Sequence, residues 1–128
     1  MKILNSVIIV IVLIVSLSAC TSDDKIKIGF IGPITGNVAS VGIDNLRGIE
    51  VAIDDINKAG GINGKQVQLI IEDDAYDETQ TIKAYQKLIN INNVDVVLSP
   101  TYGGLLAITS QADANKQVIV NSLDTSEE

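Results

Sequence analysis

The sequence contains no histidine and one cysteine, Cys20, among its 128 residues. The absence of histidine removes the side chain most often used as a general base near neutral pH. A single cysteine cannot form an intrachain disulfide, so no such cross-link holds these residues together. Asp73 and Asp74 are adjacent and would point to opposite sides of a strand, so they make a poor acid–base pair. We therefore expect no enzymatic activity, no metal site and no cofactor.

Basic residues are also scarce, with 9 lysines and arginines against 16 aspartates and glutamates and a formal net charge of −7. The few basic residues do not cluster in the sequence. Domains that bind nucleic acids usually carry a basic patch on one face. The composition therefore excludes nucleic acid as an expected partner.

The longest hydrophobic run is at the N-terminus, where residues 7–15 are uninterrupted and follow the basic start Met1-Lys2. A transmembrane helix needs about 20 apolar residues, so this run is short for a membrane span. A charged start, a short apolar run and small residues after it are typical of a secretory signal. We expect residues 1–19 to be a signal peptide that is removed on export.

The tetrapeptide Leu17-Ser18-Ala19-Cys20 resembles the bacterial lipobox, in which the cysteine is acylated and becomes the first residue of the mature chain. The alternative is an ordinary secretion signal with an incidental cysteine. Each buried methylene of an acyl chain adds about 0.8 kcal/mol of membrane affinity, so several chains on one residue anchor a protein firmly. We expect lipidation at Cys20, a polar tether over residues 20–25, and an exported location on the bacterial cell membrane.

Four strand-like runs alternate with three helix-like runs after residue 25. Gly60-Gly61 is a helix stop signal, and Asp77 with Gln80 is a capping pair for the second helix. The alternation predicts an α/β fold, with a Rossmann-like parallel sheet of order 2-1-3-4, flanking helices and right-handed crossovers. The apolar runs suggest strands that are covered on both faces. The expected strands are residues 26–31, 67–71, 94–98 and 118–120, and the apolar helix faces are Leu46, Ile49, Ile53 and Ile56, then Ile82, Tyr85, Leu88 and Ile89, then Leu105, Ile108 and Ala112.

Four loops follow the carboxyl ends of these strands, which is where ligands bind in an open parallel sheet. The helix starts in these loops would attract carboxylates through free N–H groups and the helix dipole. Gly103-Gly104 would let a ligand approach the backbone closely. Each hydroxyl alone is more often a cap or turn residue, and only their shared placement favours a binding site. The loops are 32–42, 72–77, 99–104 and 121–126, with hydroxyls at Thr35, Ser40, Ser99, Thr101, Tyr102, Ser122, Thr125 and Ser126.

A nucleotide-binding loop is disfavoured by the glycine spacing. Gly29, Gly32 and Gly36 depart from G-x-G-x-x-G, and no G-K-[ST] triplet is present. The acids Glu72–Asp74 imitate a ribose-binding carboxylate, but they follow the first loop by about 40 residues instead of roughly 20. We interpret them as a solvated strand end with charge at a helix start. Calcium binding by carboxylates alone through residues 72–77 is the alternative to the expected absence of a metal site, but the spacing lacks the D-x-[DN]-x-[DN]-G pattern.

The stretch "IKIGFIGPITGNVASVGIDNLRGIEVAIDDINKAGGINGKQVQLIIEDDAYD" resembles one known family. It is similar to the substrate-binding lipoproteins of branched-chain amino-acid ABC transporters, the leucine/isoleucine/valine-binding type of periplasmic binding protein. The similarity covers roughly residues 25–128 and is looser over the last 30. It rests on Gly32-Pro33-x-Thr35-Gly36, on Gly48 with Ala52-Ile53-x-Asp55-Ile56-Asn57, on Gly60-Gly61-Ile62-x-Gly64-Lys65, and on Asp73-Asp74 with Asp77.

The resemblance implies a set of ligand-binding positions. In such proteins the Gly-Pro-x-Thr-Gly loop belongs to the first lobe of a two-lobed fold and holds no phosphate. A serine common in the family is replaced by Tyr102, and an aromatic residue of leucine-binding members is replaced by Val41. The ligand therefore need not be leucine, since related members take amides, urea or other small polar molecules. The positions carried over are Pro100, Thr101, Tyr102 with Gly103, then Leu123, Asp124 and Thr125, together with Val41.

The resemblance also implies a function and a domain organisation. We expect an extracytoplasmic solute-binding protein that captures an amino acid or similar small polar ligand and delivers it to an ABC permease. Residues 26–128 would form part of the N-terminal lobe, so we expect the chain to be a fragment. The alternatives are the ligand-sensing domain of an exported receptor and, less favoured, a cofactor-binding α/β enzyme.

Overall fold

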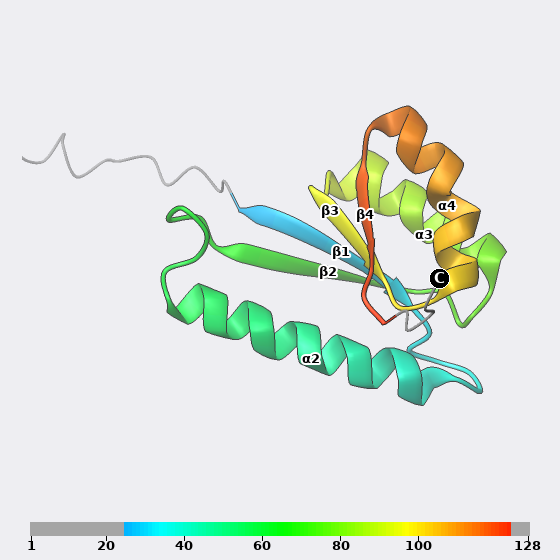
Figure 1. Cartoon of the computed structure of the whole chain (residues 1–128), viewed down its shortest axis with the longest axis horizontal. Coiled ribbons are helices and arrows are strands. Elements are labelled where there is room, and N and C mark those ends of the chain that lie inside the picture. The colour runs from blue at the N-terminus through cyan, green and yellow to red at the C-terminus, as the bar shows by residue number, and fades with distance from the viewer. Residues whose placement is uncertain (1–24, 124–128) are drawn as a thin grey trace, which may run out of the picture.

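The computed structural model describes residues 25–123 and arranges them as a four-stranded sheet with helices on both faces (Figure 1). The strands are β1 (Ile26–Gly32), β2 (Val67–Asp73), β3 (Val96–Ser99) and β4 (Val118–Asn121). Their order is β2-β1-β3-β4, and every neighbouring pair is parallel. The predicted α/β class, parallel sheet and strand order are confirmed.

Helices connect the strands in sequence. α2 (Ala39–Lys58) leads from β1 to β2, α3 (Glu78–Lys87) continues into the π-helical segment η1 (Leu88–Asn92) before β3, and α4 (Tyr102–Asn115) precedes β4. The chain first moves from β1 to one edge of the sheet and then back to the other edge. Because parallel crossovers are right-handed, α2 lies on one face and α3 and α4 lie on the other (Figure 1). The carboxyl ends of all four strands meet at the same end of the sheet.

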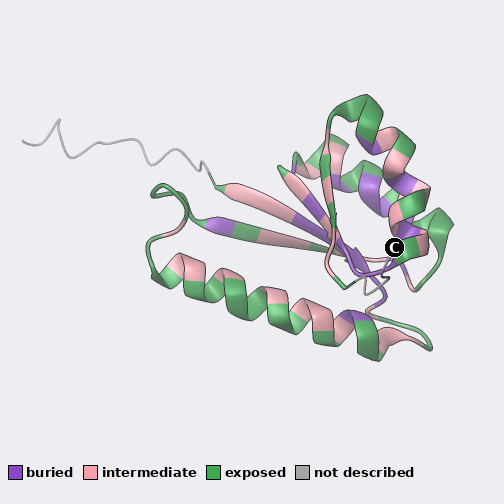
Figure 2. Cartoon of the chain, in the orientation of Figure 1, coloured by how far each residue is buried: buried purple, intermediate pink, exposed green. Residues whose placement is uncertain are grey.

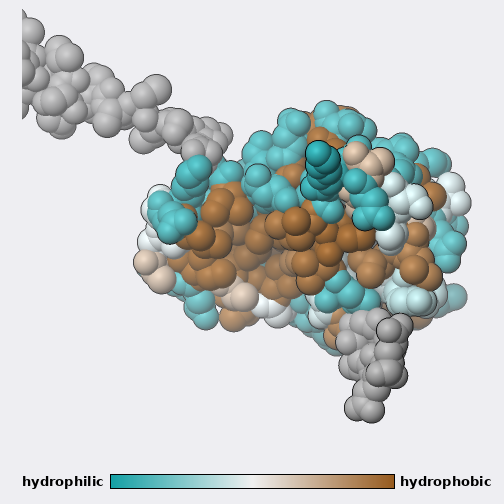
Figure 3. All heavy atoms as spheres, turned by 45° about the horizontal axis from the view of Figure 1, so that its top comes forward, coloured by the Kyte–Doolittle hydropathy of each residue, from teal (hydrophilic) through white to brown (hydrophobic). Residues whose placement is uncertain are grey.

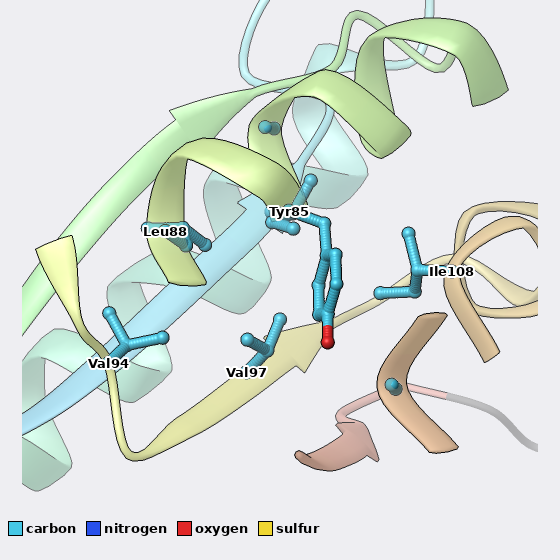
Figure 4. Close-up of a cluster of buried hydrophobic side chains, with 8 residues drawn as sticks. Tyr85, Leu88, Val94, Val97 and Ile108 are labelled. Carbon is cyan, nitrogen blue, oxygen red and sulfur yellow. The ribbon is translucent and has the colours of Figure 1, made fainter. Parts of the chain in front are cut away.

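The main hydrophobic core lies between the sheet and the helices α3 and α4. Tyr85, Leu88 and Ile108 are buried here and pack around Val97 of β3 (Figure 4). Gly29 of β1 allows this packing, because a Cβ at that position would stand 2.7 Å from Leu88 Cδ1. This core confirms the apolar faces predicted for the second and third helices, except that Leu105 is half-buried and is not part of it.

The opposite face of the sheet is covered less completely (Figure 2). Gly42 is the only buried residue of α2, and the predicted apolar residues of this helix are half-buried. Ile119 of β4 packs against the main core, so its neighbours Val118 and Val120 point to the α2 side, where they are exposed. A broad hydrophobic band is visible on the surface in Figure 3. Coverage of every strand on both faces, as predicted, is therefore wrong for β4 within residues 25–123.

Several element boundaries differ from the prediction. α2 begins at Ala39, so Val41 lies in the first turn of a helix and not in a loop. α4 begins at Tyr102, which shortens the predicted loop 99–104. β3 begins at Val96 and not at residue 94, because η1 and the left-handed Asn93 occupy the preceding positions.

Some predicted features lie outside the described residues. These are the signal peptide over residues 1–19, the lipidated Cys20 and most of its tether, and the ligand positions Asp124 and Thr125. Within residues 25–123, no helix has both the length and the apolar character needed to cross a membrane.

Candidate ligand-binding site

A cavity of about 300 Å³ opens at the carboxyl end of the sheet. Its walls come from the β1–α2 connection, the β2–α3 loop, the start of α4 and the end of β4. This volume is at the lower end of the range for small-molecule sites, about 300–1,000 Å³. The lining residues are Pro33, Val38, Val41, Tyr76, Pro100, Thr101, Tyr102, Asn121 and Leu123.

The structure brings most of the predicted ligand positions together. Five of them line this one cavity, although they come from three separate segments of the chain: Val41, Pro100, Thr101, Tyr102 and Leu123. Gly103 lines a neighbouring cavity of about 80 Å³, together with Asp74 and Glu78. Sequence reasoning missed Pro33, Val38, Tyr76 and Asn121 as lining residues. All four lie in the predicted strand-end loops 32–42, 72–77 and 121–126, so their loop position was the available signal.

Thr101 is a polar residue that lines both the main cavity and the neighbouring smaller one. It is the N-cap residue of α4 and is only 7% exposed. An N-cap threonine usually accepts a hydrogen bond from an amide of the first turn, but within residues 25–123 the Thr101 side chain makes no cap hydrogen bond. Its hydroxyl lies over Gly104, where a Cβ would come within 2.5 Å of Oγ1. The first-turn amides have no acceptor within a helix, so this end of α4 offers donors to an anion.

The described residues that line the cavity are uncharged, while Glu78 Oε1 lies outside the lining and 3.1 Å from where a Cβ on Gly103 would stand, in the first turn of α4. Pro33, Val38 and Pro100 supply apolar wall, and the tyrosines supply rings with polar tips. A second full charge on the ligand, such as the ammonium group of an amino acid, would therefore need an ionic partner from outside these lining residues, because an unpaired buried charge is costly. The described lining suits a carboxylate at the helix end and an uncharged group beside it.

Asp73 joins two of the loops that form the cavity wall. Its carboxylate accepts hydrogen bonds from the Ile34 amide at 3.0 Å, the Ala75 amide at 2.9 Å, and both the amide and the hydroxyl of Thr35. Partial burial alone would raise the pKa of Asp73. The hydrogen bond from the Thr35 hydroxyl and those from the three amides outweigh burial and hold the pKa below its ordinary value of 3.8.

Asp74 turns to a different element, as its adjacency to Asp73 on a strand predicts. It is 1% exposed and accepts hydrogen bonds from the Tyr76 amide at 3.0 Å and the Thr81 hydroxyl at 2.9 Å. The interpretation of residues 72–74 as a solvated strand end is therefore wrong for Asp74. These acids are acceptors for loop amides, and the described residues contain no group of three or more acidic, histidine or cysteine side chains placed to hold a metal.

The end of β4 is fixed to α2 by a pair of hydrogen bonds. The Asn45 side-chain amide donates to the Ser122 carbonyl at 3.2 Å, and the Ser122 hydroxyl donates back to Asn45 Oδ1 at 2.9 Å. The Ser122 amide also donates to the Ser99 carbonyl at 3.0 Å. Ser122 and Thr35 were both counted as hydroxyls available to a ligand. They bind other parts of the chain, so the cap-and-turn interpretation holds for these two residues.

Residues 25–128 match the model of a family described as "Periplasmic binding protein". A relative from Pseudomonas aeruginosa, the leucine-, isoleucine-, valine-, threonine-, and alanine-binding protein, is 46% identical over 67 residues, which is 52% of this chain and 18% of the relative.

Two solved structures extend the comparison. The branched-chain amino acid transporter substrate-binding protein LivJ from Streptococcus pneumoniae, in complex with isoleucine, has a TM-score of 0.76 and 28% identity. The match covers 81% of this chain and 30% of LivJ. A solute-binding protein of an ABC transporter from Rhodopseudomonas palustris, in complex with 3,4-dihydroxybenzoic acid, has a TM-score of 0.68 and 31% identity over 75% of this chain and 26% of its own. The chain thus spans less than a third of the length of each of these three relatives.

Proposed function

The chain belongs to the periplasmic binding protein family, and from that premise we propose that it contributes the first-lobe part of a ligand site in an exported solute-binding protein. The ligand is a small carboxylate, above all an amino acid. The protein captures it outside the cytoplasm and delivers it to an ABC permease, without changing it chemically. The alternatives of a receptor domain and a cofactor-binding enzyme are not favoured by any feature of the cavity.

The observation that carries this proposal is Thr101, a largely buried residue whose side chain makes no cap hydrogen bond with the described residues and which lines a cavity to which these residues contribute no charged side chain. A carboxylate oxygen placed there would accept from the hydroxyl and from the first-turn amides of α4. Hydrogen bonds to a charged group contribute about 1.5–3 kcal/mol each. The apolar walls from Pro33, Val38 and Pro100 would then enclose the uncharged part of the ligand.

The relatives support a carboxylate as the recognised group. Isoleucine and 3,4-dihydroxybenzoic acid, the ligands named for two similar structures, share a carboxylate and otherwise differ widely. A site built on a helix N-terminus recognises this shared group, while the neighbouring walls select the remainder of the ligand.

The location follows from the N-terminal sequence. We propose that Cys20 is acylated after removal of residues 1–19 and that the lipid holds the protein at the outer side of the cell membrane. A membrane tether would keep the ligand site near its permease, which raises the local concentration of the loaded protein at the transporter.

The test compares the N-cap threonine of α4 with a threonine inside the helix, in the protein produced from its complete gene. Thr101→Val removes the proposed ligand hydroxyl. Thr109→Val is the matched control, because the Thr109 hydroxyl donates to the Leu105 carbonyl within the helix, at 2.9 Å. Calorimetric titration with a panel of amino acids should show at least tenfold weaker binding for Thr101→Val, since one hydrogen bond to a charged group is lost. The control should bind like the wild type. Equal affinity of the wild type and Thr101→Val would refute the proposed site.

A further inference from the structure

Tyr76 is a large side chain whose position neither packing nor backbone preference explains. It lies in the loop between β2 and α3, lines the main cavity and is 65% exposed. A side chain this exposed contributes little to a hydrophobic core. Its location at the cavity is therefore the feature that needs an explanation.

The backbone at this point disfavours a bulky residue. Ala75 and Tyr76 have φ values of 48° and 65°, so two successive non-glycine residues adopt the left-handed conformation. Glycine and asparagine are the usual occupants of this region, because a Cβ crowds the following carbonyl. A residue chosen for the turn alone would be one of those two.

The loop nevertheless holds Tyr76 in a defined place. The carboxylate of Asp73 accepts from the Ala75 amide, and the buried carboxylate of Asp74 accepts from the Tyr76 amide. Asp73 is the last residue of β2 and Asp74 follows it, so these hydrogen bonds tie the loop that carries Tyr76 to the end of the strand. The residue is thus positioned with some precision beside the cavity, although its own conformational preference opposes the turn.

A second ring lines the same cavity. Tyr102, the first residue of α4, is 58% exposed and follows directly after Thr101. Contacts between aromatic rings contribute interaction energy beyond that expected from the buried area, and a tyrosine offers an apolar face with a polar tip. Two tyrosines around neutral, largely apolar walls match a flat, uncharged group better than a flexible aliphatic chain or a charged one.

We propose that Tyr76 is a specificity-determining residue that selects carboxylate ligands bearing a planar ring. The inference rests on the proposed function, since it takes the carboxylate to lie at the start of α4. The ring of the ligand then lies between the carboxylate position and the β2–α3 loop, in contact with Tyr76. An aromatic amino acid and a simple aromatic acid share this chemistry, and the ammonium group distinguishes them.

The experiment measures dissociation constants for three carboxylates, L-phenylalanine, L-leucine and benzoate, by calorimetric titration of the protein produced from its complete gene. The variants are Tyr76→Ala, which removes the ring, and Tyr76→Phe, which keeps it. Tyr76→Asn tests the fold, because asparagine tolerates the left-handed conformation. Ile91→Ala is the matched control, since Ile91 is 70% exposed and does not line the cavity.

The expected result is a wild-type preference for at least one ring-bearing ligand over leucine. Tyr76→Ala should reduce that preference by about two- to tenfold, the range of a single aromatic contact, while Tyr76→Phe and Ile91→Ala retain it. Tyr76→Asn should lose the preference without a lower Tm. If the protein binds phenylalanine and not benzoate, its ligand is an aromatic amino acid. If it binds benzoate and not phenylalanine, its ligand is a simple aromatic acid.

Two results would overturn the inference and are distinguishable from each other. Equal weakening of all three ligands by Tyr76→Ala, or a wild type that binds leucine and neither ring-bearing ligand, would refute the role of Tyr76 and leave the proposed function intact. If the wild type bound none of the three carboxylates, the proposed function would fail and this inference with it.

Discussion

Replacement of Asp73 should weaken the carboxyl end of the sheet, because this carboxylate joins two loops of the cavity wall. Two of its donors, the amides of Ile34 and Ala75, are partly buried, whereas the donors of Thr35 are exposed. The exposed donors can turn to water when the carboxylate is lost. The partly buried ones keep a net cost of about 1–1.5 kcal/mol each. We therefore expect Asp73→Ala to lower the free energy of unfolding by about 2–3 kcal/mol.

Asp73→Asn removes the charge of the side chain and keeps its shape. The asparagine oxygen can still accept from the two partly buried amides, and its NH₂ group can donate to the Thr35 hydroxyl. Charge-assisted hydrogen bonds are roughly twice as strong as neutral ones, so Asp73→Asn should cost about half as much as Asp73→Ala. Asp54→Asn is the matched control, since it breaks an exposed pair with Lys58 on α2 that contributes about 0.3–0.5 kcal/mol.

The stabilisation of the fold by the Asp73 carboxylate depends on pH. The folded-state pKa of Asp73 lies below its ordinary value of 3.8, so the stabilisation is fully present above that value and is lost as the pH falls through the folded-state pKa. Urea unfolding followed by circular dichroism should therefore show a constant difference between wild type and Asp73→Asn from pH 7 to about pH 5, and a shrinking difference below pH 4. Hydrogen exchange of the Ile34 and Ala75 amides should be faster in the variant. An unfolding difference that is zero at pH 7, or that does not change with pH, would refute the reasoning.

Three further predictions concern the scaffold and the anchor. Gly42→Ala should lower the free energy of unfolding by about 1–3 kcal/mol, because its Cβ would meet the Pro33 carbonyl oxygen at 2.0 Å. Gly48→Ala in the same helix meets nothing within 4 Å and should raise the free energy of unfolding by about 0.5–1 kcal/mol. Equal effects of the two variants in thermal unfolding would contradict this packing. Leu88→Ala should cost about 2–5 kcal/mol in urea unfolding, since the side chain is fully buried, and a cost under 1 kcal/mol would count against the core described above. Cys20→Ala should abolish labelling by fatty acid and move the protein to the soluble exported fraction, and unchanged membrane retention would instead mean that residues 7–15 remain as an anchor.

The sheet was predictable from the sequence because its signals are local. Each strand is an apolar run, and the alternation with helices restricts the topology to parallel crossovers. The capping pair at the start of α3 was also visible, and Asp77 accepts from the Gln80 amide at 2.9 Å. The π-helical segment η1 was not predictable, because it ends in the left-handed Asn93 and keeps the same apolar residues as a regular helix.

The candidate site was predictable only in part. Residues next to strand ends could be placed at the cavity, and Pro100, Thr101 and Tyr102 line it together. The roles of the acids could not be inferred, since sequence does not show that the amides near Asp73 and Asp74 point at them. Val38 and Pro33 lie in the predicted loop 32–42, but neither has a hydroxyl or other polar group that would have marked it as a ligand contact.

A crystal structure of the protein from its complete gene, with a bound amino acid or aromatic acid, tests the central claim most directly. The account predicts a carboxylate oxygen of the ligand at about 2.5–3.0 Å from the Thr101 hydroxyl, with the amides at the start of α4 as further donors. It also predicts that the uncharged remainder of the ligand contacts Pro33, Pro100 and Tyr76. A ligand whose carboxylate lies away from α4, or outside the cavity at the carboxyl end of the sheet, would contradict the account.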